Sequence, residues 1–288
     1  MCYGMSADNL PPPSAVVSTF KSNGITSMRL YAPDHATLNA LAGTGINVAF
    51  GAPNDMLPGL AANHAVAAAW VRSNILAHHP KVVFRYVVVG NEAAGGLTCH
   101  LAPAMQNMKA ALASVRLGHI VVTTSVSQAI LGVWCTPSAG QFNAEADAYM
   151  RDVIPALART GAPLMANIYP YLAWQWNTSA MDIRYALFTA PGVVVQDGAY
   201  GYQNLFDTTV DALYGHGQAR GVRERMAFGR RTYNQNLINH IGRGTPRHPG
   251  PIETYIFAMI NEDQKQAGVE QHWGLFYPNM QHVYPIKF

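Results

Sequence analysis

The sequence predicts an α/β protein, a single (β/α)8 barrel domain spanning residues 1–288. Short apolar runs alternate with amphipathic stretches from end to end, which is the pattern of a parallel sheet whose strands are separated by helices. No change of composition divides the chain, and 288 residues is a usual length for one such barrel. No Gly-x-Gly-x-x-Gly motif follows the first strand candidate, which disfavours a dinucleotide-binding fold.

The strand predictions come from short apolar runs filled with β-branched and aromatic residues. They cover residues 2–5, 27–31, 46–51, 82–90, 120–125, 164–169 and 253–260. Apolar residues at helical spacing predict helices around residues 16–20, 38–41, 66–76, 105–112, 153–157, 204–216 and 231–242. A barrel needs one strand more. Residues 217–230 occupy its place but carry four arginines and no apolar run, so we expect the seventh strand to be missing or degraded.

Composition excludes several functional classes. Hydrophobic residues make up 49% of the chain and charged residues only 12%, which suits a stable extracellular protein with a large core. A net charge of +3 without a dense Lys/Arg run argues against a nucleic-acid partner. No apolar run approaches the roughly 18 residues that span a bilayer, so no membrane partner is expected. A monomer is expected.

The N-terminus and the cysteines bear on the compartment. Met1 leads directly into Cys2-Tyr3-Gly4 without the basic and apolar regions of a signal peptide. We therefore expect either an intracellular protein or a chain that begins at a mature end. Cys2, Cys99 and Cys135 form no C-x-x-C motif, and buried or free thiols are the expectation.

Glu92 is the leading candidate for chemistry. It closes the apolar run Val87-Val88-Val89-Gly90-Asn91, so its carboxyl group is predicted at the C-terminal end of a buried strand. Ligands of parallel α/β barrels bind at that end. Burial there would favour the protonated form that a general acid needs, and hydrolysis of a glycosidic bond requires such an acid. An ordinary carboxylate at the rim of the sheet is the alternative.

Other candidates follow two more predicted strands. Glu262 and Lys265 come after the last strand and could bind sugar hydroxyl groups, although a solvated turn would have the same sequence. Tyr169 and Tyr171, near Trp174 and Trp176, end the sixth strand, and such rings suit stacking on sugars as well as ordinary packing. Tyr31, which ends the second strand, has the same two interpretations.

The histidines suggest no metal site. His78-His79 lacks a carboxylate partner at metal-binding spacing, and no H-E-x-x-H motif occurs, so no metal ion or cofactor is expected.

Several segments resemble plant glucan endo-1,3-β-glucosidases of glycoside hydrolase family 17, cereal members above all. The resemblance covers nearly the full length and rests on Cys2-Tyr3-Gly4-Met5, Met28-Arg29-Leu30-Tyr31, Gly51-Ala52-Pro53-Asn54, Val89-Gly90-Asn91-Glu92, Ala166-Asn167-Ile168-Tyr169-Pro170-Tyr171, Glu253-Thr254-Tyr255-Ile256-Phe257-Ala258-Met259 and Trp273-Gly274-Leu275-Phe276-Tyr277-Pro278.

The resemblance implies a (β/α)8 barrel that cleaves internal 1,3-β-glucosidic bonds of a β-1,3-glucan with retention of configuration. It implies that Glu92 is the acid/base and that Asn91 holds the substrate near the reacting sugar. Tyr31, Tyr169, Glu262 and Lys265 match positions that line the cleft of that family. It also implies secretion to the cell wall, apoplast or vacuole, with a role in plant defence for many members.

The sequence departs from that family at the nucleophile. The family carries Val-Ser-Glu-Ser-Gly-Trp-Pro-Ser on the seventh strand, whereas this chain has Val222-Arg223-Glu224-Arg225. Residues 222–230 can be encoded as GTC CGA GAG CGG ATG GCC TTC GGG CGG. Read one base later, these codons spell Ser-Glu-Ser-Gly-Trp-Pro-Ser-Gly. With these codons chosen by us, we hypothesise that the segment is frame-shifted, with the frame restored before Thr232.

Two functions follow. The first is an active endo-1,3-β-glucanase in which Glu224 replaces the nucleophile, its charge favoured by Arg223 and Arg225. The second is a catalytically impaired relative that only binds β-glucan, because binding and bond cleavage use separable groups.

Overall fold

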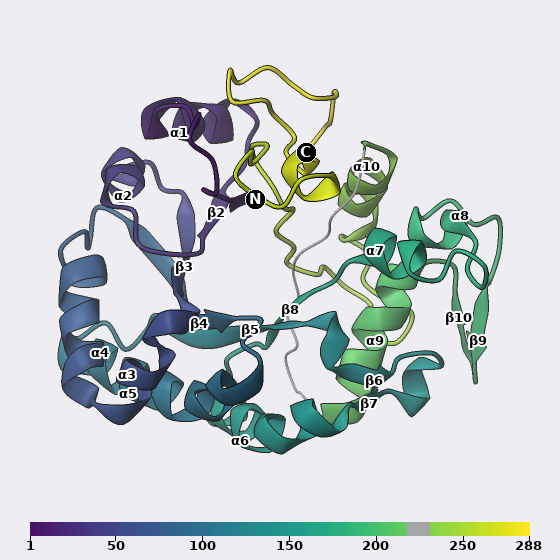
Figure 1. Cartoon of the computed structure of the whole chain (residues 1–288), viewed down its shortest axis with the longest axis horizontal. Helices are drawn as coiled ribbons and strands as arrows, with labels where there is room; N and C mark the ends of the chain where they lie inside the picture. Colours follow the sequence, from purple (N-terminus) through teal and green to yellow (C-terminus); the bar gives the residue numbers. More distant parts are fainter. Residues whose placement is uncertain (218–230) are drawn as a thin grey trace. The chain divides into compact units, whose positions relative to one another are not determined.

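The computed structural model describes residues 1–217 and 231–288 (Figure 1). These residues form two compact units, which are described separately. Unit 1 comprises Met1–Ser125, Phe257–Tyr284 and Phe288, and unit 2 comprises Val126–Ile256 and Pro285–Lys287. The single domain over residues 1–288 stays a prediction, and the expected loss of the seventh strand falls on residues outside the described part.

Unit 1 is built on a parallel sheet whose strands follow one another in sequence order (Figure 1). The strands are β1 (Cys2–Tyr3), β2 (Ser27–Leu30), β3 (Asn47–Ala52), β4 (Val83–Asn91) and β5 (Val121–Ser127), and β5 continues into unit 2. Each pairs in parallel with the next. The middles of β3, β4 and β5 are buried without alternation, as expected for strands covered on both faces. The five strand predictions in this part of the chain are confirmed.

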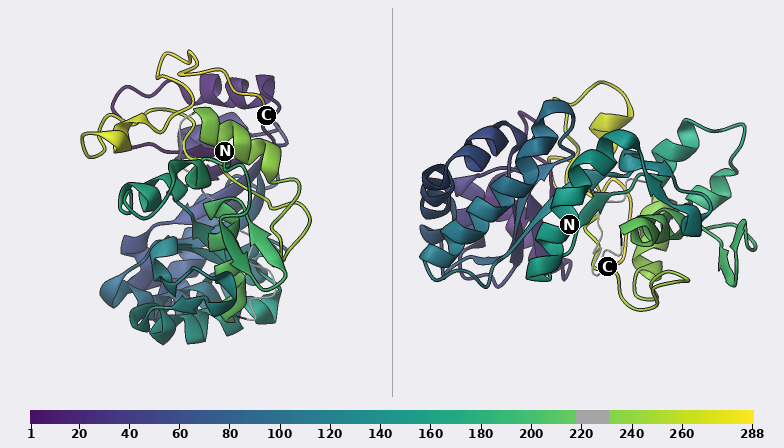
Figure 2. Two further views of the ribbon diagram at one scale, coloured as in Figure 1. Left: turned by 90° about the vertical axis from the view of Figure 1, so that its right-hand side faces the viewer. Right: turned by 90° about the horizontal axis from the view of Figure 1, so that it is seen from below.

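Helices connect these strands and lie along one face of the sheet (Figures 1 and 2). They are α1 (Pro13–Ser22), α2 (His35–Leu41), α3 (Leu57–Ala62), α4 (His64–Val71), its π-helical extension Arg72–Leu76, and α5 (Leu101–Ser114). Short 3-10 turns cover Asn54–Met56, Gly95–His100 and Val269–His272. Val16 and Phe20 show why α1 forms here, because these fully buried residues lie one turn apart on its inner side.

The predicted strand over residues 253–260 is wrong. Its second half lies in unit 1 without regular strand structure. Met259 still donates its amide to the Cys2 carbonyl oxygen at 2.8 Å, beside β1. Further backbone hydrogen bonds join this segment to residues 273–276: Leu275 donates to Ala258 at 3.0 Å, and Phe276 donates to Met259 at 3.0 Å. An apolar run predicts burial here but not which neighbour takes the backbone hydrogen bonds.

Unit 2 contains one of the predicted strands, β8 (Met165–Asn167), and four longer helical segments: α6 (Ala144–Thr160), α7 (Pro170–Gln175), α9 (Leu205–Gly217) and α10 (Arg231–His240). The single turn α8 (Ile183–Ala186) and 3-10 turns at Gln128–Ile130 and Pro137–Ala139 complete its helices among the described residues. The end of α6 follows the sequence closely, because Gly161 adopts the left-handed conformation (φ 65°) that stops a helix.

Two antiparallel hairpins of unit 2 were not predicted. They pair β6 (Leu131–Val133) with β7 (Gln141–Phe142), and β9 (Val195–Asp197) with β10 (Tyr200–Tyr202). Each of these strands has only two or three residues. Tertiary hydrogen bonds hold the second hairpin: Tyr202 donates to Asp211 of α9 at 2.8 Å, and Arg247 donates to Asp197 at 2.8 Å.

Candidate active site

The end of β4 places Asn91 and Glu92 in an unusual backbone conformation. Gly90 has a φ of 75° and Glu92 a φ of 50°, so the chain visits the left-handed region twice within three residues. Glycine adopts this region freely, but for glutamate it costs on the order of 1 kcal/mol. The amide of Glu92 donates to the Ser125 carbonyl oxygen at 2.8 Å, which holds the turn against β5. Such strain is concentrated at functional sites. The Glu92 side chain, which is half-buried, extends from this strained backbone.

Asn91 is held from two directions. Asn54 accepts from the Asn91 amide and donates to the Asn91 carbonyl oxygen, both at 2.8 Å. Arg29 Nη2 donates to the Asn91 side-chain oxygen at 2.8 Å, and its Nη1 lies 3.4 Å from Ser125 Oγ. Arg29 is 1% exposed, so this charged group positions the end of β4 from within the sheet. Sequence reasoning missed the roles of Arg29 and Asn54, although both occur in segments that carry the resemblance.

Tyr31 lies next to the same arginine. The Arg29 guanidinium carbon is 4.7 Å from the centre of the Tyr31 ring, a cation–π contact. On another side, Tyr31 meets Phe257 edge to face, with ring centres 6.0 Å apart. The backbone at Tyr31 also requires a glycine opposite, because a Cβ on Gly51 would lie 2.2 Å from the Tyr31 carbonyl oxygen. Close packing therefore holds Tyr31 in place.

Glu262 and Lys265 form an ion pair, with Nζ 3.4 Å from Oε2. Glu262 is 3% exposed, and its Oε1 accepts from the Ser6 amide at 2.9 Å. Lys265 Nζ also lies 4.2 Å from the centre of the Phe257 ring. The space for the Glu262 carboxylate exists only because residue 4 is glycine, since a Cβ there would lie 2.3 Å from Oε2.

Contacts in unit 1 thus join four predicted site residues in one series. Asn91 is bonded to Arg29, which contacts Tyr31; Tyr31 contacts Phe257, and Phe257 contacts Lys265, the partner of Glu262. Glu92 follows Asn91 directly in the chain. This arrangement offers an acid, aromatic rings and hydrogen-bonding groups, which are the parts that a glycoside-cleaving site needs.

The remaining predicted residues lie elsewhere. Tyr169 and Tyr171 belong to unit 2, where the Tyr169 amide donates to Gln128 Oε1 at 2.8 Å and the rings of Tyr171 and Trp174 are 5.5 Å apart. Glu224 lies outside the described residues. Within the described ranges, no group of three or more His, Cys, Asp or Glu side chains could hold a metal ion, and no helix is long and apolar enough to cross a membrane.

Comparison with known proteins identifies the class. The parallel α/β architecture matches the (β/α)8 barrel-like fold of glycoside hydrolases, and the sequence model of "Glycosyl hydrolases family 17" matches residues 1–229 and 226–288. The chain belongs to glycosyl hydrolase family 17.

Individual relatives show which members of the family this chain resembles. The chain is 65% identical over 305 aligned positions to Lichenase-2 of Hordeum vulgare, covering 100% of this chain and 97% of the relative. It is 47% identical to an acidic glucan endo-1,3-beta-glucosidase of Zea mays, covering 100% of this chain and 90% of the relative. A solved structure, from work on two plant β-glucan endohydrolases with distinct substrate specificities, is 65% identical, with a TM-score of 0.98 over 100% of this chain and 99% of its own.

Proposed function

We propose that the protein hydrolyses internal 1,3-β-glucosidic bonds of β-glucans, with Glu92 as the acid/base. Family membership supports glycosidic hydrolysis, and the relatives point to a β-glucan as the substrate. The observation that carries the proposal is the constrained end of β4, where Gly90, Asn54, Arg29 and Ser125 all act on the Asn91–Glu92 pair.

In this proposal, Glu92 donates a proton to the leaving glycosidic oxygen and later takes one from water. A retaining reaction needs a second carboxylate about 5–5.5 Å away on the other side of the sugar. Glu224 is the proposed nucleophile. Asn91 would hold the reacting sugar, Tyr31, Tyr169 and Tyr171 would contact sugar rings, and Glu262 and Lys265 would bind hydroxyl groups. We also propose secretion to the cell wall, apoplast or vacuole and a role in defence.

A mixed-linkage β-glucan is a second candidate substrate. The relative named Lichenase-2 is 65% identical to this chain, whereas the glucan endo-1,3-beta-glucosidase of Zea mays is 47% identical. Lichenan therefore belongs beside laminarin in any test of the linkage that is cleaved.

Binding of β-glucan without turnover is the second candidate function. The family match is divided into two parts that meet at residues 226–229, in the segment where the nucleophile motif is expected. The alignment to Lichenase-2 spans 305 positions against 288 residues here, so the relative has segments without a counterpart. A misplacement of the nucleophile by about 1 Å can reduce the rate on the order of a hundredfold.

Purified full-length chain, assayed for reducing ends on laminarin and lichenan beside an affinity measurement, tests these proposals. Turnover that Glu92→Gln reduces by about 10²–10⁴-fold, with binding retained, supports hydrolysis with Glu92 as the acid/base. Loss of turnover in Glu224→Gln supports its role as nucleophile. Binding with no turnover on either glucan supports the second function. Turnover that is unchanged in Glu92→Gln rules out the acid/base role.

A further inference from the structure

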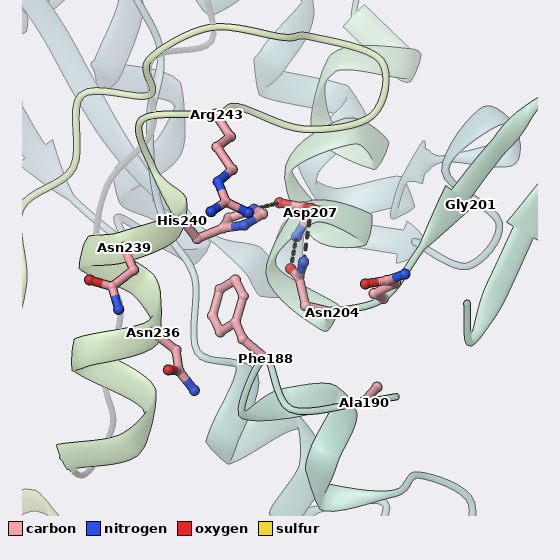
Figure 3. A pocket seen from close by; sticks show the side chains of 10 residues that line it. Phe188, Ala190, Gly201, Asn204, Asp207, Asn236, Asn239, His240 and Arg243 are labelled. Atoms are coloured by element: carbon pink, nitrogen blue, oxygen red, sulfur yellow. Dashed lines mark hydrogen bonds and ion pairs between the residues drawn. The ribbon is translucent and has the colours of Figure 1, made fainter. Parts of the chain in front are cut away.

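Unit 2 contains a pocket of about 320 Å³ near the start of α9 and the end of α10 (Figure 3). The side chains that matter for its chemistry are Phe188, Asn204, Asn236, Asn239, His240 and Arg243. None of them belongs to the site proposed above. The volume lies at the lower end of the range for small-molecule sites, roughly 300–1,000 Å³.

One wall of the pocket is fixed by Asp207, which is 4% exposed. Its carboxylate accepts from His240 Nε2 at 2.7 Å and from Asn204 Nδ2 at 2.8 Å, while the Asp207 amide donates to Asn204 Oδ1 at 2.8 Å (Figure 3). These bonds occupy both carboxylate oxygens. The His240–Asp207 bond also fixes the orientation of the His240 ring.

A second part of the lining comes from α10 and the turn after it. Asn236, Asn239, His240 and Arg243 recur at three- and four-residue spacing, so they lie along one side of the helix. The amide of Arg243 donates to the His240 carbonyl oxygen at 2.9 Å, which continues the turn beyond the end of α10. Asn236, Asn239 and His240 therefore project from a helix and Arg243 from the hydrogen-bonded turn after it.

The hydrogen bonds already made determine what remains for a ligand. Asn236 Nδ2 donates to the Leu187 carbonyl oxygen at 2.9 Å, which leaves Oδ1 of Asn236 as an acceptor. Gln235 accepts from the Lys287 amide at 2.9 Å, so its Nε2 is the donor to Asn239 Oδ1 at 3.3 Å. Asn239 Nδ2 therefore remains as a donor. The Arg243 guanidinium makes no hydrogen bond or ion pair with the residues described in the structure.

We propose that this pocket binds a neutral saccharide unit. It presents an acceptor (Asn236 Oδ1) beside donors (Asn239 Nδ2 and Arg243), and hydroxyl groups both donate and accept. The lining also includes the Asp207 carboxylate, which disfavours an anionic ligand. Phe188 supplies an apolar surface beside these groups, with its ring centre 5.0 Å from that of His240. The choice of a glucosyl unit as occupant rests on the proposed β-glucan substrate.

The test titrates laminaritriose into the full-length chain carrying Glu92→Gln, which should slow hydrolysis, while NMR follows the imidazole C–H signals of His240. The saccharide should shift these signals with a dissociation constant on the order of millimolar. The double variant Asn239→Ala/Arg243→Met should weaken this binding at least about tenfold, as expected for two lost hydrogen bonds. Arg151→Met, an exposed change on α6 of the same unit, should leave it unchanged.

Three outcomes would overturn the proposal: His240 signals that laminaritriose does not shift, a double variant that binds as before, or a shift produced by inorganic phosphate and not by the saccharide. The readout depends on occupancy of the pocket and not on turnover. A chain without hydrolytic activity could still bind here, and an active one could fail to, so the two proposals are tested separately.

Discussion

The backbone amide of Glu92 donates to the carbonyl oxygen of Ser125 at 2.8 Å, and this bond joins the turn after β4 to the neighbouring strand β5. The bond is made while Glu92 has a φ of 50°, a conformation that glutamate seldom adopts. The proposed acid/base therefore occupies a position that the backbone alone would assign to glycine.

Glu92→Gly should be more stable than Glu92→Ala by about 1 kcal/mol, because only alanine retains the cost of the left-handed conformation. Both variants remove the carboxylate, so the difference reports on the backbone. Urea unfolding measures it.

The matched comparison is at Ala94, whose φ is −135°. There, the glycine variant should be less stable than the parent by roughly 0.5–1 kcal/mol, because glycine loses more conformational entropy on folding. Equal stability of Glu92→Gly and Glu92→Ala would show that the conformation at residue 92 is unstrained.

Gly4→Ala should destabilise the chain by about 1–3 kcal/mol, since its Cβ would displace the buried Glu262 carboxylate from the Ser6 amide. If Glu262 binds hydroxyl groups as proposed, the same change should weaken β-glucan binding. Thermal unfolding and affinity for laminarin are the measurements.

Gly96→Ala is the control, because a Cβ at this exposed residue would meet nothing within 4 Å. It should alter neither stability nor binding. If the Gly4→Ala chain has the same melting temperature as the parent, the Glu262 carboxylate moves aside without cost.

Asp197 should stabilise unit 2 at neutral pH and lose this effect in acid. Burial alone raises the pKa of the Asp197 carboxyl group, but hydrogen bonds from Ser138 and Arg247 outweigh burial and hold the pKa below its usual value. Because the folded-state pKa is lowered, the stabilisation is complete above the unfolded pKa of about 3.9 and is lost as pH falls through the folded value.

Asp197→Asn should therefore cost about 1–2 kcal/mol at pH 7 and progressively less below pH about 4. Asp182→Asn is the comparison and should change stability little at any pH, since Asp182 pairs with Arg184 at the surface, where solvent screens such pairs. Urea unfolding from pH 7 to pH 3 checks both. If the loss of stability in Asp197→Asn is constant over this pH range, the pKa of Asp197 is not lowered in the folded protein.

Genomic DNA and transcript across residues 217–230 should contain the nucleophile motif in the second reading frame. The reason is that codons can be chosen for Val222 to Arg230 that spell Ser-Glu-Ser-Gly-Trp-Pro-Ser-Gly when read one base later, and the family match is divided within this segment. One uninterrupted frame with incompatible codons would remove the hypothesis.

Much of the fold could be predicted from local pattern. Val87, Val88 and Val89 mark the interior of β4, and Gly161 marks the end of α6, because strand burial and helix termination depend on neighbouring residues. The same pattern failed at residues 253–260, where the backbone pairs with the segment near Phe276. It also missed β6, β7, β9 and β10, which are held by tertiary contacts such as Tyr202 with Asp211.

In the candidate site, too, some features could be predicted from the sequence and others could not. The position of Glu92 at the end of a buried strand, and the family that its surroundings indicate, were determined by the sequence alone, since both depend on residues adjacent in the chain. Only the tertiary structure decided that Arg29 holds Asn91, that Gly4 makes room for Glu262, and that the side chains of α9 and α10 enclose a polar pocket. The physical reason is distance along the chain: Arg29 and Asn91 are 62 residues apart, and Ser6 and Glu262 are 256 apart, so packing of the whole core brings them together.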